Sequence, residues 1–392
     1  MQIYLDYSAT TPPRSEVVNY VKKILTEEWG NPSSLHQWGQ RAAMSLEMAR
    51  TQVAYLLNAV DPESIIFTSG GTEADNLAIL GIAGQYSTPQ HLIISSVEHP
   101  AISEPVRRLE AQGWEVTRLP VNRQGRINPL HLKAAIQSNT VLISIIHGQS
   151  EVGTVQPIEE LGNIARNHGI LFHTDAVQTA GRVKIDLQRL PIDLLSLSAH
   201  KIYGVQGAGA LYVRPGIEID PLVLGGGQEG KKRSGTQAVA IIAGFGLAAE
   251  LAATEMIKES SRLIGLRDRL FDLMADCPYL VPTGDRLYRL PHHISFVIQN
   301  SLQTGETEKI TGKMIVRQMN LAGIAISAGS ACHSGKLSPS PILSAMGYSE
   351  KEGLRGIRLT LGKETTLEDI DWTAMVLKQV LNRLIPQLAI AK

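Results

Sequence analysis

The feature that most constrains this chain is an alternation of short apolar runs with amphipathic stretches, which continues to about residue 215. Short apolar runs predict strands, and stretches such as 129–137 and 158–168 have the periodicity of helices. Several runs are apolar on both faces, which is typical of strands covered by helices on both sides. The expected strands are Ser64–Thr68, His91–Ser95, Val141–Ile146, Ile170–Thr174, Leu194–Ser198 and Ala208–Val213.

After about residue 237 the pattern changes to one long helical stretch followed by isolated strands. The chain has 392 residues, more than a single hydrophobic core usually supports, so two domains are expected. The first part predicts an α/β domain with a mostly parallel sheet, which we place at residues 14–253. The second predicts a smaller α+β domain formed by residues 254–392 together with the N-terminal segment 1–13. Its expected elements are helices over 238–274 and 367–385 and strands at 293–298 and 324–327.

Charge and cysteine content argue against several classes of protein. With 37 basic and 37 acidic residues, the chain has no electrostatic footprint for a nucleic acid. Its two cysteines, Cys277 and Cys332, are too few for a disulfide framework and suit a reducing compartment. The N-terminus lacks the pattern of a signal peptide, and the longest uncharged stretch, 237–249, is too short to span a bilayer. We therefore expect a cytoplasmic protein with no membrane or nucleic-acid partner.

Sheets of this type bind ligands at the carboxyl ends of their strands, so the residues that follow each strand are the candidates for chemistry. The first expected strand is followed by Ser69-Gly70-Gly71-Thr72. Glycines that open a helix leave backbone N–H groups free for a phosphate, and Thr72 adds a hydroxyl. Gly-Gly turns after strands are also common where no ligand binds.

Two further strand ends carry side chains that suit an aromatic cofactor. His99 follows the strand at 91–95, where its ring could stack on a cofactor and move protons. A lone histidine at such a place is more often a hydrogen-bonded structural residue. Asp175 follows the strand at 170–174, and a carboxylate that leaves a buried strand needs a partner. A pyridinium N–H would be such a partner, and a salt bridge or a helix cap is the alternative.

Lys201 comes almost directly after the apolar strand Leu194–Ser198. A lysine that cannot easily reach solvent has a lowered pKa and can form a Schiff base. Taken alone, a catalytic role for such a lysine is the rarer case. Together, the four features place a phosphate-binding turn, a stacking histidine, an acid for a ring nitrogen and an imine-forming lysine on successive strands. That combination predicts pyridoxal 5'-phosphate (PLP) as the cofactor.

With these residues in place, the chain resembles the cysteine desulfurases of the NifS/IscS type. They are a branch of the class V aminotransferases and have the PLP-dependent transferase fold type I, which implies a seven-stranded sheet in the large domain. The matching segments follow one order over nearly the whole chain with matching spacings, which makes the resemblance highly specific. The segments are 4–12 (YLDYSATTP), 30–36 (GNPSSLH), 67–76 (FTSGGTEADN), 98–99 (EH), 175–178 (DAVQ), 198–204 (SAHKIYG), 225–229 (GGGQE), 233–236 (RSGT) and 327–332 (SAGSAC).

The resemblance implies a role for each matching residue. Lys201 would bind the cofactor covalently, Asp175 would pair with the pyridine nitrogen, and Gln178 would contact the phenolic oxygen. His99 would stack on the ring and serve in acid–base steps. Arg358 would clamp the substrate carboxylate, a task that suits a bidentate guanidinium. A neighbouring subunit would contribute to the phosphate site, which implies a homodimer with shared active sites. The residues expected at the phosphate are Gly71, Thr72, Ser198, His200 and, from the neighbour, Thr236.

Cys332 lies in a stretch rich in Ser and Gly, which predicts a loop. By the resemblance it is the nucleophile: its thiolate attacks the sulfur of bound L-cysteine and leaves L-alanine and a Cys332 persulfide. The sulfur then passes to an acceptor protein, such as an iron–sulfur cluster scaffold, or into other sulfur trafficking. Exposure and thiolate access decide such reactivity. Cys277, near a helix end, is interpreted as structural.

Two segments depart from the family pattern. Residues 147–153 read HGQSEVG where the family usually has HVNNEIG, so Ser150 replaces an asparagine that helps to hold the cofactor oxygen and the substrate carboxylate. Serine reaches less far, and substrate positioning weaker by about 1–2 kcal/mol is expected if a buried partner is left unsatisfied. Residues 230–232 (GKK) fill a gap that commonly holds Arg-Gly, and lysine does not replace arginine at a bidentate site.

The sequence therefore predicts a PLP-dependent cysteine desulfurase, a sulfurtransferase with L-cysteine as substrate and no metal. One alternative is another PLP reaction on the same scaffold, such as a lyase acting on cystine or selenocysteine or an aminotransferase. Lyases of this type do not need Cys332. A second alternative is a non-catalytic partner of sulfur-transfer machinery, against which the intact Lys201, Asp175 and His99 argue.

Overall fold

The computed structural model describes residues 2–299, 310–329 and 338–385. Its large sheet has seven strands in the order β2-β8-β7-β6-β5-β3-β4. Strand β8 runs antiparallel to β2 and β7, and every other neighbouring pair is parallel. The predicted mostly parallel, seven-stranded sheet is confirmed. The strands are β2 (Ile65–Thr68), β3 (His91–Ser95), β4 (Glu115–Leu119), β5 (Thr140–Ser144), β6 (Leu171–Asp175), β7 (Leu194–Ser198) and β8 (Gly209–Val213).

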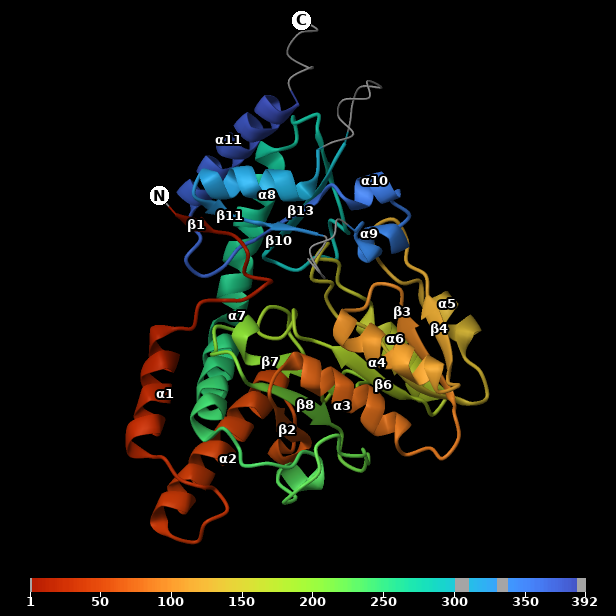
Figure 1. The fold of residues 1–392 in the computed structure, drawn as a ribbon, viewed down its shortest axis with the longest axis vertical. Coiled ribbons are helices and arrows are strands. Elements are labelled where there is room, and N and C mark those ends of the chain that lie inside the picture. Colours follow the sequence, from red (N-terminus) through yellow and green to blue (C-terminus); the bar gives the residue numbers. More distant parts are fainter. Residues whose placement is uncertain (1, 300–309, 330–337, 386–392) are drawn as a thin grey trace, which may run out of the picture.

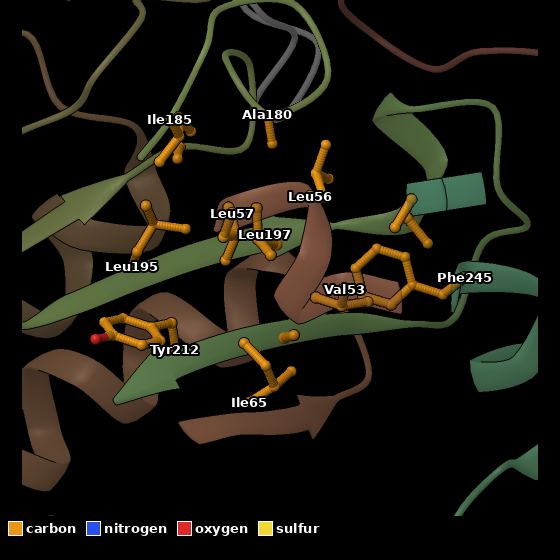
Figure 2. Packing of buried hydrophobic residues seen from close by; sticks show 14 of the residues in the cluster. Val53, Leu56, Leu57, Ile65, Ala180, Ile185, Leu195, Leu197, Tyr212 and Phe245 are labelled. Atoms are coloured by element: carbon orange, nitrogen blue, oxygen red, sulfur yellow. The ribbon is translucent and has the colours of Figure 1, made fainter. Parts of the chain in front are cut away.

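Helices cover both faces of this sheet (Figure 1). Alternate residues of one strand point to opposite faces, so Ile65 and Phe67 of β2 join one buried cluster and Ile66 joins another. Figure 2 shows part of the first cluster, in which Ile65, Leu195 and Leu197 of the sheet belong to the same buried core as Val53 and Phe245. The helices of this part are α1 (Ser15–Glu27), α2 (Gln37–Leu57), α3 (Gly71–Ala83), α4 (Pro100–Ala111), α5 (Pro129–Ala135) and α6 (Ile158–Asn167), with short 3₁₀ turns η1 (Pro62–Ser64), η2 (Ala199–Lys201) and η3 (Glu229–Lys231).

The second part of the chain has its own sheet and its own apolar cluster. Strands β12-β13-β10-β9 form an antiparallel sheet, and the N-terminal strand β1 pairs in parallel with β11. This pairing brings the first residues of the chain beside its last third. The elements are β1 (Ile3–Tyr4), β9 (Leu280–Pro282), β10 (His293–Ile298), β11 (Ile324–Ala325), β12 (Ser327–Ala328), β13 (Gly356–Thr360), α8 (Gly312–Leu321), α9 (Pro341–Ala345), α10 (Glu350–Gly353) and α11 (Leu367–Leu384).

Helix α7 (Val239–Leu273) runs between the two parts (Figure 1). It is the one helix in the described ranges that is long and apolar enough to cross a membrane. Its N-terminal half belongs to the core of the large sheet and its C-terminal half to the second cluster, so packing accounts for its apolar composition. The domain boundary at residue 253 falls inside this helix and stays a prediction.

Candidate active site

Lys201 and Asp175 stand at the carboxyl ends of neighbouring parallel strands, β7 and β6. The Lys201 Nζ donates hydrogen bonds to the carbonyl oxygens of Ser8 at 2.6 Å and Ala9 at 2.7 Å. Burial lowers the pKa of Lys201 to about 8, and the charges of Arg182 and Arg358 act in the same direction. The amine therefore exchanges its proton near neutral pH, unlike an ordinary lysine.

Asp175 is a buried carboxyl whose Oδ1 accepts the Val177 N–H at 2.9 Å. Burial raises its pKa, and the charges of His99 and Lys201 oppose that shift. Asp75 of α3 lies behind it, and burial followed by the charge of Asp175 raises the pKa of Asp75 well above its usual range. Two adjacent buried carboxylates repel each other, which disfavours ionisation of both at once, and the charge of Lys201 favours the ionised form of Asp175.

The side chain of Gln178 spans from the sheet to the N-terminal segment. Its Nε2 donates to the Ser8 carbonyl at 2.9 Å, while its buried Oε1 has no partner within the described part of the chain. His200 contacts the same segment, with its Nδ1 3.1 Å from the Thr10 hydroxyl. Burial lowers the pKa of His200 to about 4, which makes the ring neutral at physiological pH. The residues around Ser8 therefore bring together the large sheet and the first residues of the chain.

Helix α3 starts at Gly71 beside the strand ends. A Cβ at Gly71 would lie 2.7 Å from Val177 and 3.5 Å from the Cβ of Ser198, so the glycine allows the helix N-terminus to approach this closely. Thr72 and His99 are exposed and line a cavity of about 410 Å³ between α3 and α4. The N-terminal N–H groups of α3 thus lie beside Lys201's strand, where an anion would be favoured.

Arg358 of β13 reaches the same region from the smaller sheet. Its Nη2 donates to Asp6 Oδ1 at 2.6 Å, and its Nη1 donates to the carbonyl oxygen of Ser150 at 3.1 Å. Ser150 therefore contacts Arg358 through its backbone, and not through the hydroxyl that the sequence comparison singled out. The buried Nε of Arg358 has no partner among residues 2–299, 310–329 and 338–385. Arg358 is thus held at both terminal nitrogens, while its Nε–H still lacks an acceptor within those ranges.

Glu151 is a buried carboxyl that sequence analysis did not single out. Burial raises its pKa to about 7, against the opposing effects of the Ser340 hydroxyl and the Arg358 charge. A Cβ at Gly329 would lie 2.3 Å from its Oε1, so the carboxyl abuts the backbone there. Gly329 and Ser340 flank in sequence the segment that contains Cys332.

Three further predicted residues are the two cysteines and Thr236. Cys332 lies outside the described residues, and its role stays a prediction. Cys277 is buried, and burial raises the pKa of its thiol, which suits the structural interpretation. Thr236 is exposed, and its segment is tied to α3 by an Arg233–Glu73 ion pair of 2.8 Å.

The donor set fits PLP. Lys201 supplies an amine of lowered pKa for an aldehyde, buried Asp175 supplies a carboxylate for a ring nitrogen, and Gln178 has an unpartnered buried oxygen. The glycine start of α3 suits a phosphate. The roles of the individual residues stay predictions. The structure does bring together, at one edge of the sheet, Lys201, Asp175, Gln178 and the start of α3.

Besides Glu151, three further contributors were missed at the sequence level: Asp6, Ser8 and Asp75. All three lie inside the segments that carry the family resemblance, which is the signal that could have found them. Asp6 and Ser8 hold Arg358 and Lys201 across more than 190 residues of sequence. No local periodicity indicates such contacts.

Comparison with known proteins identifies the group to which the chain is similar. The family model described as aminotransferase class-V matches residues 3–372. A cysteine desulfurase IscS of Dictyoglomus turgidum is 46% identical over 387 residues, which covers 98% of this chain and 95% of that protein. A solved structure titled NifS-like protein has a TM-score of 0.89 and 31% identity, covering 98% of this chain and all of that one. A structure titled SspA in complex with cysteine has a TM-score of 0.80 and 36% identity. The match covers 92% of this chain and 99% of that one. The chain therefore belongs to the class-V aminotransferase family.

Proposed function

We propose that this chain is a PLP-dependent cysteine desulfurase that converts L-cysteine to L-alanine. The observation that carries the proposal is the placement of Lys201, a partly buried amine with a pKa of about 8, at a strand end beside Asp175 and close to the charge of Arg358. Similarity to cysteine desulfurases over nearly the full length, and a similar structure solved with cysteine, support the choice of substrate.

The residues of the chain divide the work between binding and proton transfer. The bound cofactor supplies an electron-withdrawing ring. Asp175, a buried carboxyl close to the charge of Lys201, would pair with the ring nitrogen and hold a proton there. Lys201 Nζ, whose pKa is about 8, would accept and return a proton at neutral pH. Arg358 would bind the substrate carboxylate.

We propose Cys332 as the sulfur acceptor within the chain. The carbon–sulfur bond of L-cysteine breaks, a bond forms between that sulfur and Cys332 Sγ, and the thiol proton ends on the methyl group of L-alanine. The carbon is reduced and the sulfur is oxidised by the same two electrons, so the step needs no outside oxidant. The persulfide then carries the sulfur to an acceptor.

The test is to measure L-alanine and sulfide together after L-cysteine and a thiol reductant are added to the PLP-loaded enzyme. We expect equal amounts of both products, and a loss of at least ~100-fold in turnover for Cys332→Ala, because the nucleophile is removed. Cys277→Ala is the matched control and should keep turnover, since that thiol is buried. Full activity in Cys332→Ala would favour a lyase instead.

We further propose delivery of this sulfur to a cytoplasmic acceptor protein such as an iron–sulfur cluster scaffold. The relatives named IscS support that proposal. A second experiment, run without the thiol reductant and with a limiting amount of ³⁵S-labelled cysteine, follows the label. The label should remain on the wild-type chain after gel filtration, move to an added scaffold protein, and not attach to Cys332→Ala.

We also propose that the active unit is a homodimer in which Thr236 completes the neighbour's phosphate site. Large apolar side chains are exposed near this segment and just before α2, namely Leu224 at 81% and Leu35 at 93%. Light scattering should give about twice the 42.6 kDa chain mass. Thr236→Ala should raise the dissociation constant for PLP by roughly 10–150-fold, as the loss of one hydrogen bond to a charged group does. A fully active monomer would contradict the proposal.

A further inference from the structure

Two adjacent buried histidines, His292 and His293, connect the smaller sheet to the active site. The Nε2 of His292 lies 3.1 Å from the Ser8 hydroxyl, and the Nε2 of His293 lies 3.0 Å from the Ser150 carbonyl oxygen. Both rings are fully buried, and neither Nδ1 has a partner in the described ranges. When a buried polar ring makes only one hydrogen bond, loss of that bond leaves the ring unsatisfied and is costly in free energy.

The register of the smaller sheet explains why His293 and Arg358 meet at one carbonyl. His293 and Ser295 are two residues apart on β10, so their side chains share a face. Ser295 is the register partner of Arg358 on β13, which places Arg358 on that face as well. This face contacts the turn at 149–153. His293 and Arg358 both donate to the carbonyl oxygen of Ser150, and the Ser295 hydroxyl donates to the carbonyl oxygen of Val152 at 3.3 Å.

The chemistry of the contact fixes the state of the His293 ring. A carbonyl oxygen only accepts, so the Nε2 of His293 carries the hydrogen. Burial first, and then the charges of Arg289 and Arg358, lower the pKa of His293 well below its usual value, so the ring is neutral. Gly153 makes room for it: this residue has φ +79°, and a Cβ there would lie 2.6 Å from the His293 Nδ1. The ring is thus a fixed, uncharged donor.

We propose that His293 is a positioning residue for substrate binding, which fixes the Ser150 carbonyl so that this oxygen and Asp6 together orient the guanidinium of Arg358. The inference rests on the proposed function, in which Arg358 binds the substrate carboxylate. Asp6 holds one terminal nitrogen of Arg358 and Ser150 the other, so the guanidinium plane is set by these two acceptors. Loss of the His293 donor frees the Ser150 carbonyl and, with it, one of the two restraints.

The test compares His293→Phe, which keeps a ring of similar size without the donor, with His293→Gln, whose amide N–H reaches about as far. The measurement is the dissociation constant of the PLP-loaded enzyme for L-alanine, followed through the cofactor absorbance, together with KM and kcat for L-cysteine. His293→Phe should raise the dissociation constant and KM by roughly 3–10-fold, the effect of one net hydrogen bond, and change kcat less. His293→Gln should restore values within about two-fold of wild type, since its donor replaces the lost one.

The matched control is Ser295→Ala, which removes a bond between the same sheet face and the same turn at Val152 but leaves Ser150 untouched. Its dissociation constant for L-alanine should stay within about two-fold of wild type, because no restraint on Arg358 is lost. Equal losses in the Phe and Gln variants, or wild-type binding in His293→Phe, would overturn the inference. If His293→Phe does not fold, His293→Asn replaces it, since its shorter amide leaves the carbonyl unpaired and should weaken binding alike. Wild-type enzyme that binds L-alanine but makes none from L-cysteine would contradict the proposed function and leave this comparison intact.

Discussion

Lys201→Ala should lower the rate of L-alanine formation from L-cysteine by at least ~1000-fold, because the Lys201 amine both binds the cofactor and transfers a proton in the proposed reaction. The physical basis is the lowered pKa of about 8, caused mainly by burial and then by Arg182 and Arg358. At pH 8 about half of such amines are neutral, against under about 1% of ordinary lysines. Removal of this amine leaves no described lysine in an equivalent position beside Asp175.

Lys201→Arg is the control that separates chemistry from anchoring. Arginine can still donate to the carbonyls of Ser8 and Ala9, which hold Lys201 in the native chain. A guanidinium stays charged at every accessible pH, so it can neither form an imine nor exchange protons. We expect both variants to be folded, by circular dichroism, and both to be inactive in the alanine assay. More than about one tenth of wild-type activity in Lys201→Arg would show that the neutral amine is not required.

Much of the large sheet follows from the sequence because its strands are buried on both faces. A run such as Leu194–Ser198 has to be apolar where helices cover both sides, and its bounds agree with the structure to the residue. Strand β4 was not predicted, because it is not buried on both faces. It is one of the two edge strands, four of its five residues are partly or fully exposed, and Glu115 and Arg118 interrupt any apolar run. Edge strands carry charges in this way because one side has no partner strand.

The active site follows from the sequence only where it is built from the ends of neighbouring strands. Lys201 and Asp175 meet because β6 and β7 are parallel neighbours. The contacts that hold Lys201 and Arg358 come instead from Ser8 and Asp6, in a segment that returns from the start of the chain. Such contacts depend on tertiary packing, which no local pattern encodes. Ser150 shows a second reason why the sequence does not predict the whole site. It contacts Arg358 through its backbone carbonyl, and a comparison of side chains with the family pattern does not reveal such a contact.

Glu229→Ala should lower the free energy of unfolding by about 3–5 kcal/mol, because it removes the buried counter-charge of a buried arginine. The side chains of Glu229 and Arg50 are only 1% and 6% exposed, and Arg50 donates to both carboxylate oxygens, at 2.9 and 3.2 Å. The same carboxylate accepts the Phe67 N–H of β2 at 2.9 Å and the Gln237 amide at 3.1 Å. One substitution thus removes the acceptor of four hydrogen bonds, and urea unfolding followed by circular dichroism measures the cost.

Glu47→Ala is the matched control, since Glu47 also contacts Arg50, at 3.2 Å, but from a side chain that is 52% exposed. Water screens that pair, so its loss should cost less than about 1 kcal/mol. The double variant Arg50→Met with Glu229→Leu adds a stricter test. It removes both charges, and it should be less destabilised than Glu229→Ala because only the Phe67 and Gln237 donors then lose a partner. If Glu229→Ala were no less stable than Glu47→Ala, burial of the ion pair would not be what holds the segment at 229–231 against β2. If the double variant were the least stable of all, the pair would contribute net stability beyond the penalty for an unpaired charge.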